Sequence, residues 1–177
     1  MSAPISDAGP VATDSGAPAG GAGVRRIHRL LGNYSHDHQN ATNRLIHWLC
    51  VPPIVWSVMA ALWAIPVPAV IGRPGLWAFM VTFVAWVWYW RQSRPIGLTL
   101  LAVFAVFGLI CHLLLEGIGA RGLLVTAAIV FVLAWIGQFI GHHLEGSRPS
   151  FLTDITYLLI GPAWLAQKAL RKAGIAI

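Results

Sequence analysis

The fold is decided by two apolar runs, PIGLTLLAVFAVFGLICHLLL (Pro95–Leu115) and GLLVTAAIVFVLAWIGQFIGHHL (Gly122–Leu144). The runs hold 21 and 23 residues and contain no Lys, Arg, Asp or Glu. An α-helix needs about 20 predominantly apolar residues to cross the hydrocarbon core of a bilayer, where every backbone polar group must be bonded within the protein. Each run therefore predicts a membrane-spanning helix.

Three more uncharged runs flank this pair. Leu45–Ile65 has the length of a span, and the shorter Gly75–Trp90 can cross if the bilayer thins or a neighbouring helix tilts. The last run, Ile155–Gln167, is too short to span, so we expect it to be re-entrant or interfacial. The sequence thus predicts an all-α membrane bundle of four spans with a C-terminal re-entrant or interfacial helix.

The composition supports a membrane protein and excludes several other classes. Of the 177 residues, 57% are apolar and 10% charged, whereas soluble domains average about 45–50% and about 25%. The only cysteines, Cys50 and Cys111, lie inside apolar runs, which argues against a disulfide scaffold. Residues 1–24 are rich in Ala, Gly, Pro and Ser and predict a disordered tail, followed by one membrane domain over residues 25–177.

The basic residues give the predicted bundle an orientation. With four spans, ten of the twelve Lys and Arg residues fall on one side of the membrane, and Arg73 and Arg121 fall on the other. Cytoplasmic loops carry an excess of Lys and Arg, so we predict a multi-pass protein of a bacterial-type inner membrane with both termini in the cytoplasm. A fifth span would reduce the split to seven against five. The net charge of +6 is spread over the ends of the runs, which argues against a nucleic-acid partner.

Histidines from the two ends of the bundle are predicted to meet. A four-span topology brings the start of the first span, with His47, and the end of the fourth, with His142, to the cytoplasmic interface. His36 and His38 precede the first span on the same side. His38 and His47 would point in opposite directions on one continuous helix, so the chain must turn between them if both bind one metal. Good N-cap residues for such a turn are Asn40, Thr42 and Asn43.

The end of the fourth span presents a polar stripe. Gln138, His142 and Glu145 are spaced at i, i+4 and i+7, which is one face of a helix. Gly141 lets another backbone approach this face closely. Three neutral imidazoles suit a borderline metal such as Zn, Fe or Cu. Glu145 either completes a set of two histidines and a carboxylate or orients a histidine from outside the metal's coordination shell.

Two segments resemble a known family. They are YSHDHQNATNRLIHWLCVP (Tyr34–Pro52) and WIGQFIGHHLEGSRPS (Trp135–Ser150). Both are similar to the 2-hydroxy fatty acid dioxygenases of the fungal endoplasmic reticulum and their bacterial relatives. The chain departs from that pattern at Cys50, where the bacterial relatives usually have Gly, and at Ser150, where Ala is common. The matching positions are His38, Asn43, His47, Gln138, His142 and Glu145.

The resemblance implies an Fe(II)-dependent enzyme that uses molecular oxygen to shorten a 2-hydroxy fatty acid by one carbon. It implies His38, His47 and His142 as metal ligands and a substrate whose hydroxyl and carboxylate chelate the metal while its acyl tail lies between the spans. Asn43, Gln138 and Arg148 are then expected to hydrogen-bond the ligands or the substrate carboxylate. Glu145 is the fourth expected site residue and either binds the metal or orients a histidine.

Two other functions fit the same residues. A zinc-dependent membrane hydrolase of lipid esters or amides would use three histidines and an activated water, with Glu145 as the base. A non-enzymatic lipid-binding scaffold would use the polar cluster only to tie helices together. Membrane lipid is a partner in every case, and the sequence does not indicate an oligomeric state.

Overall fold

The computed structural model describes residues 19–36, 38–146 and 156–175. These residues form five helices, in agreement with the predicted all-α class. Residues 1–18, which make up most of the predicted tail, lie outside the described part of the chain, and residues 19–24 belong to the first helix. The helices are α1 (Ala19–His36), α2 (Ala41–Ala64), α3 (Leu76–Gln92), α4 (Arg94–Glu145) and α5 (Thr156–Lys172).

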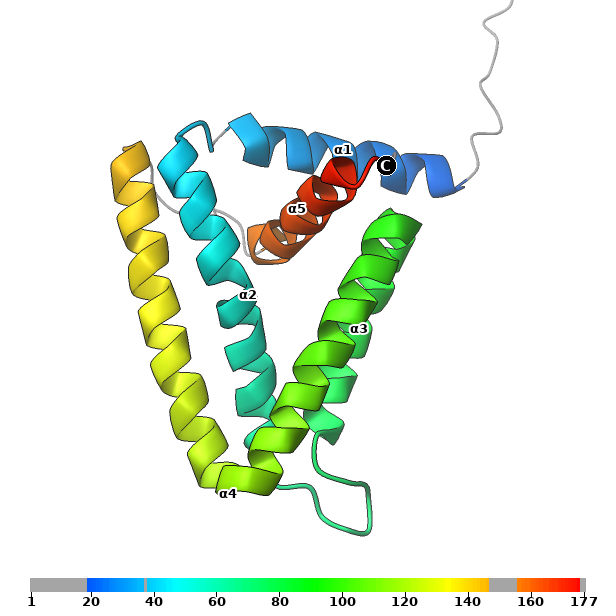
Figure 1. The fold of residues 1–177 in the computed structure, drawn as a ribbon. Helices are drawn as coiled ribbons and strands as arrows, with labels where there is room; N and C mark the ends of the chain where they lie inside the picture. The colour runs from blue at the N-terminus through cyan, green and yellow to red at the C-terminus, as the bar shows by residue number, and fades with distance from the viewer. Residues whose placement is uncertain (1–18, 37, 147–155, 176–177) are drawn as a thin grey trace, which may run out of the picture.

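Helix α4 consists of two arms that meet at Gly119. This residue has φ 71° and ψ 172°, a backbone conformation that essentially only glycine adopts. The break reverses the chain, so the arms run in opposite directions (Figure 1). They correspond to the two apolar runs Pro95–Leu115 and Gly122–Leu144. Glycine at this position therefore lets two predicted helices follow one another with no intervening loop.

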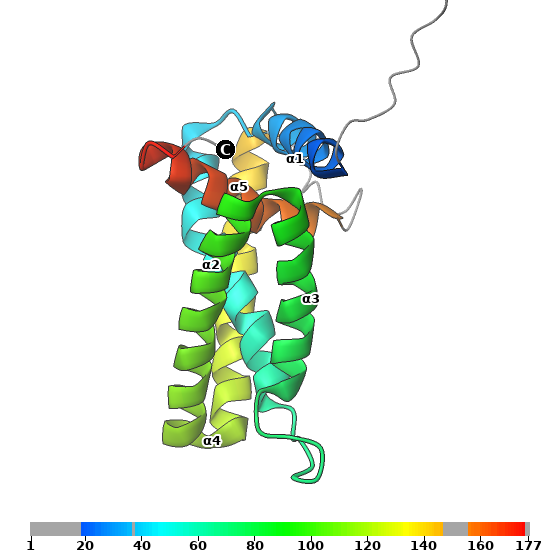
Figure 2. The same ribbon diagram turned by 90° about the vertical axis from the view of Figure 1, so that its right-hand side faces the viewer.

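Helices α2 and α4 are long and apolar enough to cross a membrane. The α3–α4 junction lies at the same end of the bundle as α1 and α5, while the break in α4 and the α2–α3 connection lie at the other end (Figures 1 and 2). Many large apolar side chains on the outside of α4 are exposed, among them Leu98, Leu109 and Leu133. An apolar surface of this extent is typical of a protein covered by lipid.

Helices α1 and α5 lie crosswise over one end of the bundle, where α2 begins and α4 ends (Figures 1 and 2). They share a hydrophobic core in which Ile27, Leu31 and Tyr34 of α1 join Ile160 and Trp164 of α5. The predicted interfacial or re-entrant piece is thus part of a longer helix that continues to Lys172. Together α1 and α5 cover the end of the bundle that carries the polar residues.

Candidate metal centre

Three histidines from three segments meet at the covered end of the bundle. His38 lies in the link between α1 and α2, His47 in the second turn of α2, and His142 in the last turn of α4. One ring nitrogen from each lies within 4.8 Å of the others, and all three residues are buried, with exposed fractions of 1%, 1% and 6%. We refer to these three residues as the histidine cluster. The structure therefore brings together the three predicted ligands.

The chain turns between His38 and His47, as their spacing requires. Asn40 caps α2 from an extended backbone conformation, φ −68° and ψ 125°. Its side-chain oxygen accepts hydrogen bonds from the backbone N–H groups of Thr42 at 2.8 Å and Asn43 at 3.3 Å. The cap satisfies donors that the first turn of a helix leaves without partners. Asn40, one of the predicted cap residues, thus fixes the turn that brings the rings of His38 and His47 together.

Backbone carbonyls orient two of the rings. Nδ1 of His38 donates to the Tyr34 carbonyl at 2.7 Å, and Nδ1 of His47 donates to the Asn43 carbonyl at 2.9 Å. Because a carbonyl oxygen only accepts, each Nδ1 carries the hydrogen and each Nε2 keeps its lone pair. This arrangement is the usual one for metal-binding histidines, whose second nitrogen donates to a carbonyl or carboxylate.

The third ring has an unsatisfied nitrogen. Nδ1 of His142 is buried and has no hydrogen-bond partner among the residues that the structure describes. A buried nitrogen left in this way is unfavourable unless a ligand or ion satisfies it. The donor set of three buried imidazoles, two of them held by hydrogen bonds from Nδ1, therefore fits a divalent transition metal.

Glu145 connects the end of α4 to the start of α2. Its carboxylate accepts hydrogen bonds from the backbone N–H groups of Gln39 and Asn40, the latter at 2.8 Å, and from the side-chain amide of Asn43. The histidine cluster does not include it. Both of its oxygens are thus engaged with the chain segment that carries His38 and His47.

Glycines allow α2 and the second arm of α4 to approach closely. A Cβ at Gly141 would collide with the side-chain oxygen of Asn43, and a Cβ at Gly137 would lie 2.6 Å from the Cys50 sulfur. Small residues of this kind bring helix backbones together in membrane proteins. The sequence predicted the approach of another backbone at Gly141, and the atoms that come close there belong to the side chains of Asn43 and Ile46 on α2. Cys50, where the chain departs from the family pattern, fills the space opposite Gly137. The histidine cluster forms with this cysteine present.

Two aromatic residues that sequence reasoning did not single out cover the cluster. The Tyr34 ring stacks on His38 with centroids 4.1 Å apart, and the Trp164 centroid lies 6.0 Å from that of His38 and 6.4 Å from that of His47. Trp164 Nε1 donates to the Ser35 hydroxyl at 2.8 Å, which ties α5 to α1. Tyr34 stands four residues before His38, a spacing that could have indicated it. Trp164 lies in the uncharged run Ile155–Gln167, where no pattern of polar residues indicates a site.

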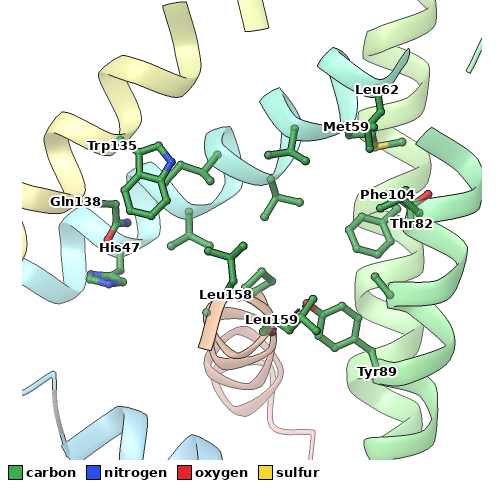
Figure 3. A pocket seen from close by; sticks show the side chains of 18 of the residues that line it. His47, Met59, Leu62, Thr82, Tyr89, Phe104, Trp135, Gln138, Leu158 and Leu159 are labelled. Carbon is green, nitrogen blue, oxygen red and sulfur yellow. Dashed lines mark hydrogen bonds between the residues drawn. The ribbon is translucent and has the colours of Figure 1, made fainter. Parts of the chain in front are cut away.

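A cavity of about 200 Å³ opens beside the cluster, between α2, α3, α4 and α5. His47, His142 and Gln138 line one end of it, and Figure 3 shows Gln138 next to His47. Gln138 is buried, and its Nε2 has no hydrogen-bond partner within the described part of the chain. The predicted residue Gln138 therefore presents a donor at the boundary between the histidines and the apolar cavity.

The remaining sequence candidates lie elsewhere. His36 and His143 are exposed and do not belong to the cluster. Arg148, predicted to bind the substrate carboxylate, falls outside the described residues.

One comparison with known proteins agrees with this chemistry. A family model described as 2-hydroxy-palmitic acid dioxygenase Mpo1-like matches residues 24–173, which include every member of the histidine cluster. Searches of curated proteins and of solved structures returned no match.

Proposed function

The chain belongs to the Mpo1-like 2-hydroxy-palmitic acid dioxygenase family, and from this premise we propose that it is an Fe(II)-dependent dioxygenase that shortens 2-hydroxy fatty acids by one carbon. The observation that carries the proposal is a buried group of three histidines at the end of an apolar cavity. The reaction needs no external reductant. The hydroxyl-bearing carbon becomes the new carboxyl carbon, the old carboxyl carbon leaves as CO₂, and O₂ accepts the four electrons, with one water formed.

His38, His47 and His142 would hold the iron through the nitrogens that face one another. Bound there, Fe(II) supplies the redox chemistry with oxygen that protein side chains cannot perform. The Tyr34 and Asn43 carbonyls keep the rings of His38 and His47 in the tautomer that a metal requires. Tyr34 and Trp164 cover the rings and limit the access of water.

Glu145 and Asn43 are proposed as positioning residues. Glu145 accepts N–H groups from Gln39 and Asn40, which lie between α1 and α2, and from Asn43 in the first turn of α2, so its contacts favour an orienting role over direct metal binding. The same contacts occupy three of the roughly four acceptor positions of the carboxylate and hold it toward the start of α2, which disfavours Glu145 as the general base of a zinc hydrolase. Asn43 links Glu145 to the histidine cluster, because its carbonyl accepts from the His47 ring and its side-chain amide donates to Glu145.

The substrate's polar end would lie at Gln138, whose buried Nε2 can donate to a hydroxyl or carboxylate oxygen. Arg148 is proposed to pair with the carboxylate, on the strength of its place in the sequence motif. The acyl tail would enter the apolar cavity. A metal at the covered end of the bundle matches the depth at which the polar group of a membrane fatty acid resides.

We also propose that α2, α3 and the two arms of α4 span a bacterial-type inner membrane, with α1 and α5 on the cytoplasmic surface. The exposed apolar side chains of α4 support spans in lipid. The described basic side chains of α1 and α5 support the orientation, since Arg29, Arg171 and Lys172 are exposed on the two crosswise helices. Residues 25–177 then form one domain after an N-terminal tail.

The proposal is tested on purified protein loaded with Fe(II) under anaerobic conditions. We expect about one iron per chain and an oxygen-dependent loss of 2-hydroxypalmitate that yields the acid one carbon shorter. Activity on lipid esters that persists without oxygen and requires zinc would instead establish the hydrolase. Absence of both metal binding and turnover would leave the lipid-binding scaffold.

A further inference from the structure

The cavity beside the histidine cluster extends along one face of α2. Its lining residues on this helix begin at His47 and end at Leu62, and they recur with helical spacing through Val51, Val55 and Met59. At 1.5 Å per residue, the fifteen steps from His47 to Leu62 correspond to about 22 Å. The hydrocarbon of one leaflet is about 15 Å deep, half of a core about 30 Å thick. The cavity face is therefore long enough for an extended acyl chain.

Among the described residues that line the cavity, the polar groups that could bind a ligand lie at one end. Away from the cluster, the Thr82 hydroxyl donates to the Ala78 carbonyl at 2.7 Å, and the Tyr89 hydroxyl donates to the Leu159 carbonyl at 2.9 Å. These inward polar groups are thus satisfied by the protein itself. The Nε2 of Gln138, which has no partner among the described residues, lies at the histidine end. The cavity matches an amphiphile with a single polar end.

A second cavity, of about 480 Å³, begins where the first one ends. Met59, Thr82 and Phe104 line both cavities. Figure 3 shows these three side chains at the end opposite His47 and Gln138. The Phe104 ring packs near Tyr89, with centroids 6.4 Å apart, and a Cβ at Gly108 would lie 3.3 Å from the Met59 terminal methyl. Side chains from α2, α3 and α4 therefore lie between the two cavities.

We propose that Met59 and Phe104 form a wall that sets the greatest acyl-chain length the enzyme accepts. This inference rests on the proposed function, since it takes the occupant to be the tail of a 2-hydroxy fatty acid. Each methylene that enters the cavity leaves the lipid or water and gains packing contacts until the chain end meets the wall. Any further carbon must displace two well-packed side chains, which is unfavourable in a dense core.

Two variants open the wall and one shortens the cavity. Met59→Ala and Phe104→Leu remove atoms between the cavities, whereas Val58→Phe adds a ring from a cavity-lining residue that is 44% exposed and so has room to adjust. Leu98→Ala is the matched control, because Leu98 lies on the same arm of α4 as Phe104 but is exposed and lines neither cavity. Each protein is assayed with a series from 2-hydroxymyristate to 2-hydroxylignocerate.

The measurements are equilibrium competition against radiolabelled 2-hydroxypalmitate and oxygen-dependent turnover. In the wall variants, we expect the preference for 2-hydroxylignocerate over 2-hydroxypalmitate to rise about tenfold or more, the size of effect that a hydrophobic pocket gives for a change in fit. Val58→Phe should shift the preference toward 2-hydroxymyristate by a similar factor. Leu98→Ala should leave the ratios unchanged.

The two readouts separate this inference from the proposed function. If the wild-type protein turns over these acids but all three cavity variants keep its chain-length ratios, the wall is overturned and the dioxygenase stands. If the binding ratios shift as expected but no acid is consumed, the wall stands and the dioxygenase is overturned. Wild-type protein that binds none of the acids overturns the wall. Because Val58→Phe removes nothing from the core, the inference stays testable if a wall variant fails to fold.

Discussion

The side-chain amide of Asn43 on α2 donates to the carboxylate of Glu145 on α4, across 102 residues of sequence. The Asn43 carbonyl also accepts from the Nδ1 of His47. One residue therefore joins the carboxylate at the end of the last arm to a ring of the histidine cluster. Perturbing this pair should change how well the rings are aimed, with the ligands themselves left in place.

Removing the Glu145 carboxylate is expected to weaken metal binding without abolishing it. Outer partners of metal ligands typically contribute about 10–100-fold in affinity. We expect Glu145→Ala to raise the iron dissociation constant by about that factor and Glu145→Gln by less, because the amide oxygen still accepts one N–H. Titration with Fe(II) under anaerobic conditions measures this. Loss of all iron at saturating concentration would show that Glu145 is itself a ligand.

The histidine cluster predicts a contrast between neighbouring residues. His47→Ala and His142→Ala should each abolish stoichiometric iron binding and turnover. His143→Ala, which changes the exposed residue next to His142, should retain both. Elemental analysis and thermal unfolding together distinguish a metal site from a non-enzymatic scaffold. In the scaffold, substitution of a buried histidine would change the stability, while the metal content of every variant would stay the same.

Iron retention should fall with acidity. Imidazole must be neutral to bind a metal, so protons compete with iron for His38, His47 and His142. Binding is expected to be firm at pH 7 and above and to weaken as the pH falls from 7 toward about 4 and the rings become protonated. Anaerobic equilibrium dialysis across this range gives the dependence. An affinity that does not vary with pH would argue against a site made of imidazoles.

Crowding the contact between α2 and α4 should damage the site without changing a metal ligand. In Gly141→Ala, the new methyl group meets the Asn43 side chain, and overpacking of this kind costs about 1–3 kcal/mol. We expect lower thermal stability together with weaker iron binding. Gly117→Ala is the matched control on the same helix, because a Cβ there meets nothing within 4 Å. Equal behaviour of the two variants would mean that the close approach at Gly141 is unimportant.

Arg148 should affect the substrate and leave the metal unaffected. A charge-assisted hydrogen bond contributes about 1.5–3 kcal/mol, so Arg148→Gln is expected to raise the KM for 2-hydroxypalmitate about ten- to a hundredfold. Its iron content should equal that of the wild-type protein. A variant with normal KM but reduced iron would reassign Arg148 to the support of the metal centre.

Much of the site follows from local spacing in the sequence. The need for a turn between His38 and His47, the cap at Asn40 and the stripe from Gln138 to Glu145 are all properties of single helices, and the structure has each of them. The meeting of His47 and His142 is predicted by counting the spans and the Lys and Arg residues between them. This count places the start of the first span and the end of the fourth on the same side.

Other features of the site depend on contacts that no sequence pattern predicts. The groups that Glu145 binds include the backbone N–H groups of Gln39 and Asn40, and any residue except proline offers such a donor. The position of Trp164 over the cluster depends on how α5 crosses α1, which helical periodicity does not encode. The reversal of the chain at Gly119, which joins the two arms of α4 without a loop, depends on one glycine conformation.

The distribution of the histidine cluster along the chain has a consequence for biosynthesis. Its first member is at position 38 and its last at position 142, in the final turn of α4. A growing polypeptide therefore offers an incomplete donor set until residue 142 has left the ribosome. On the proposed function, the iron can bind only after the segments that precede this residue have been made.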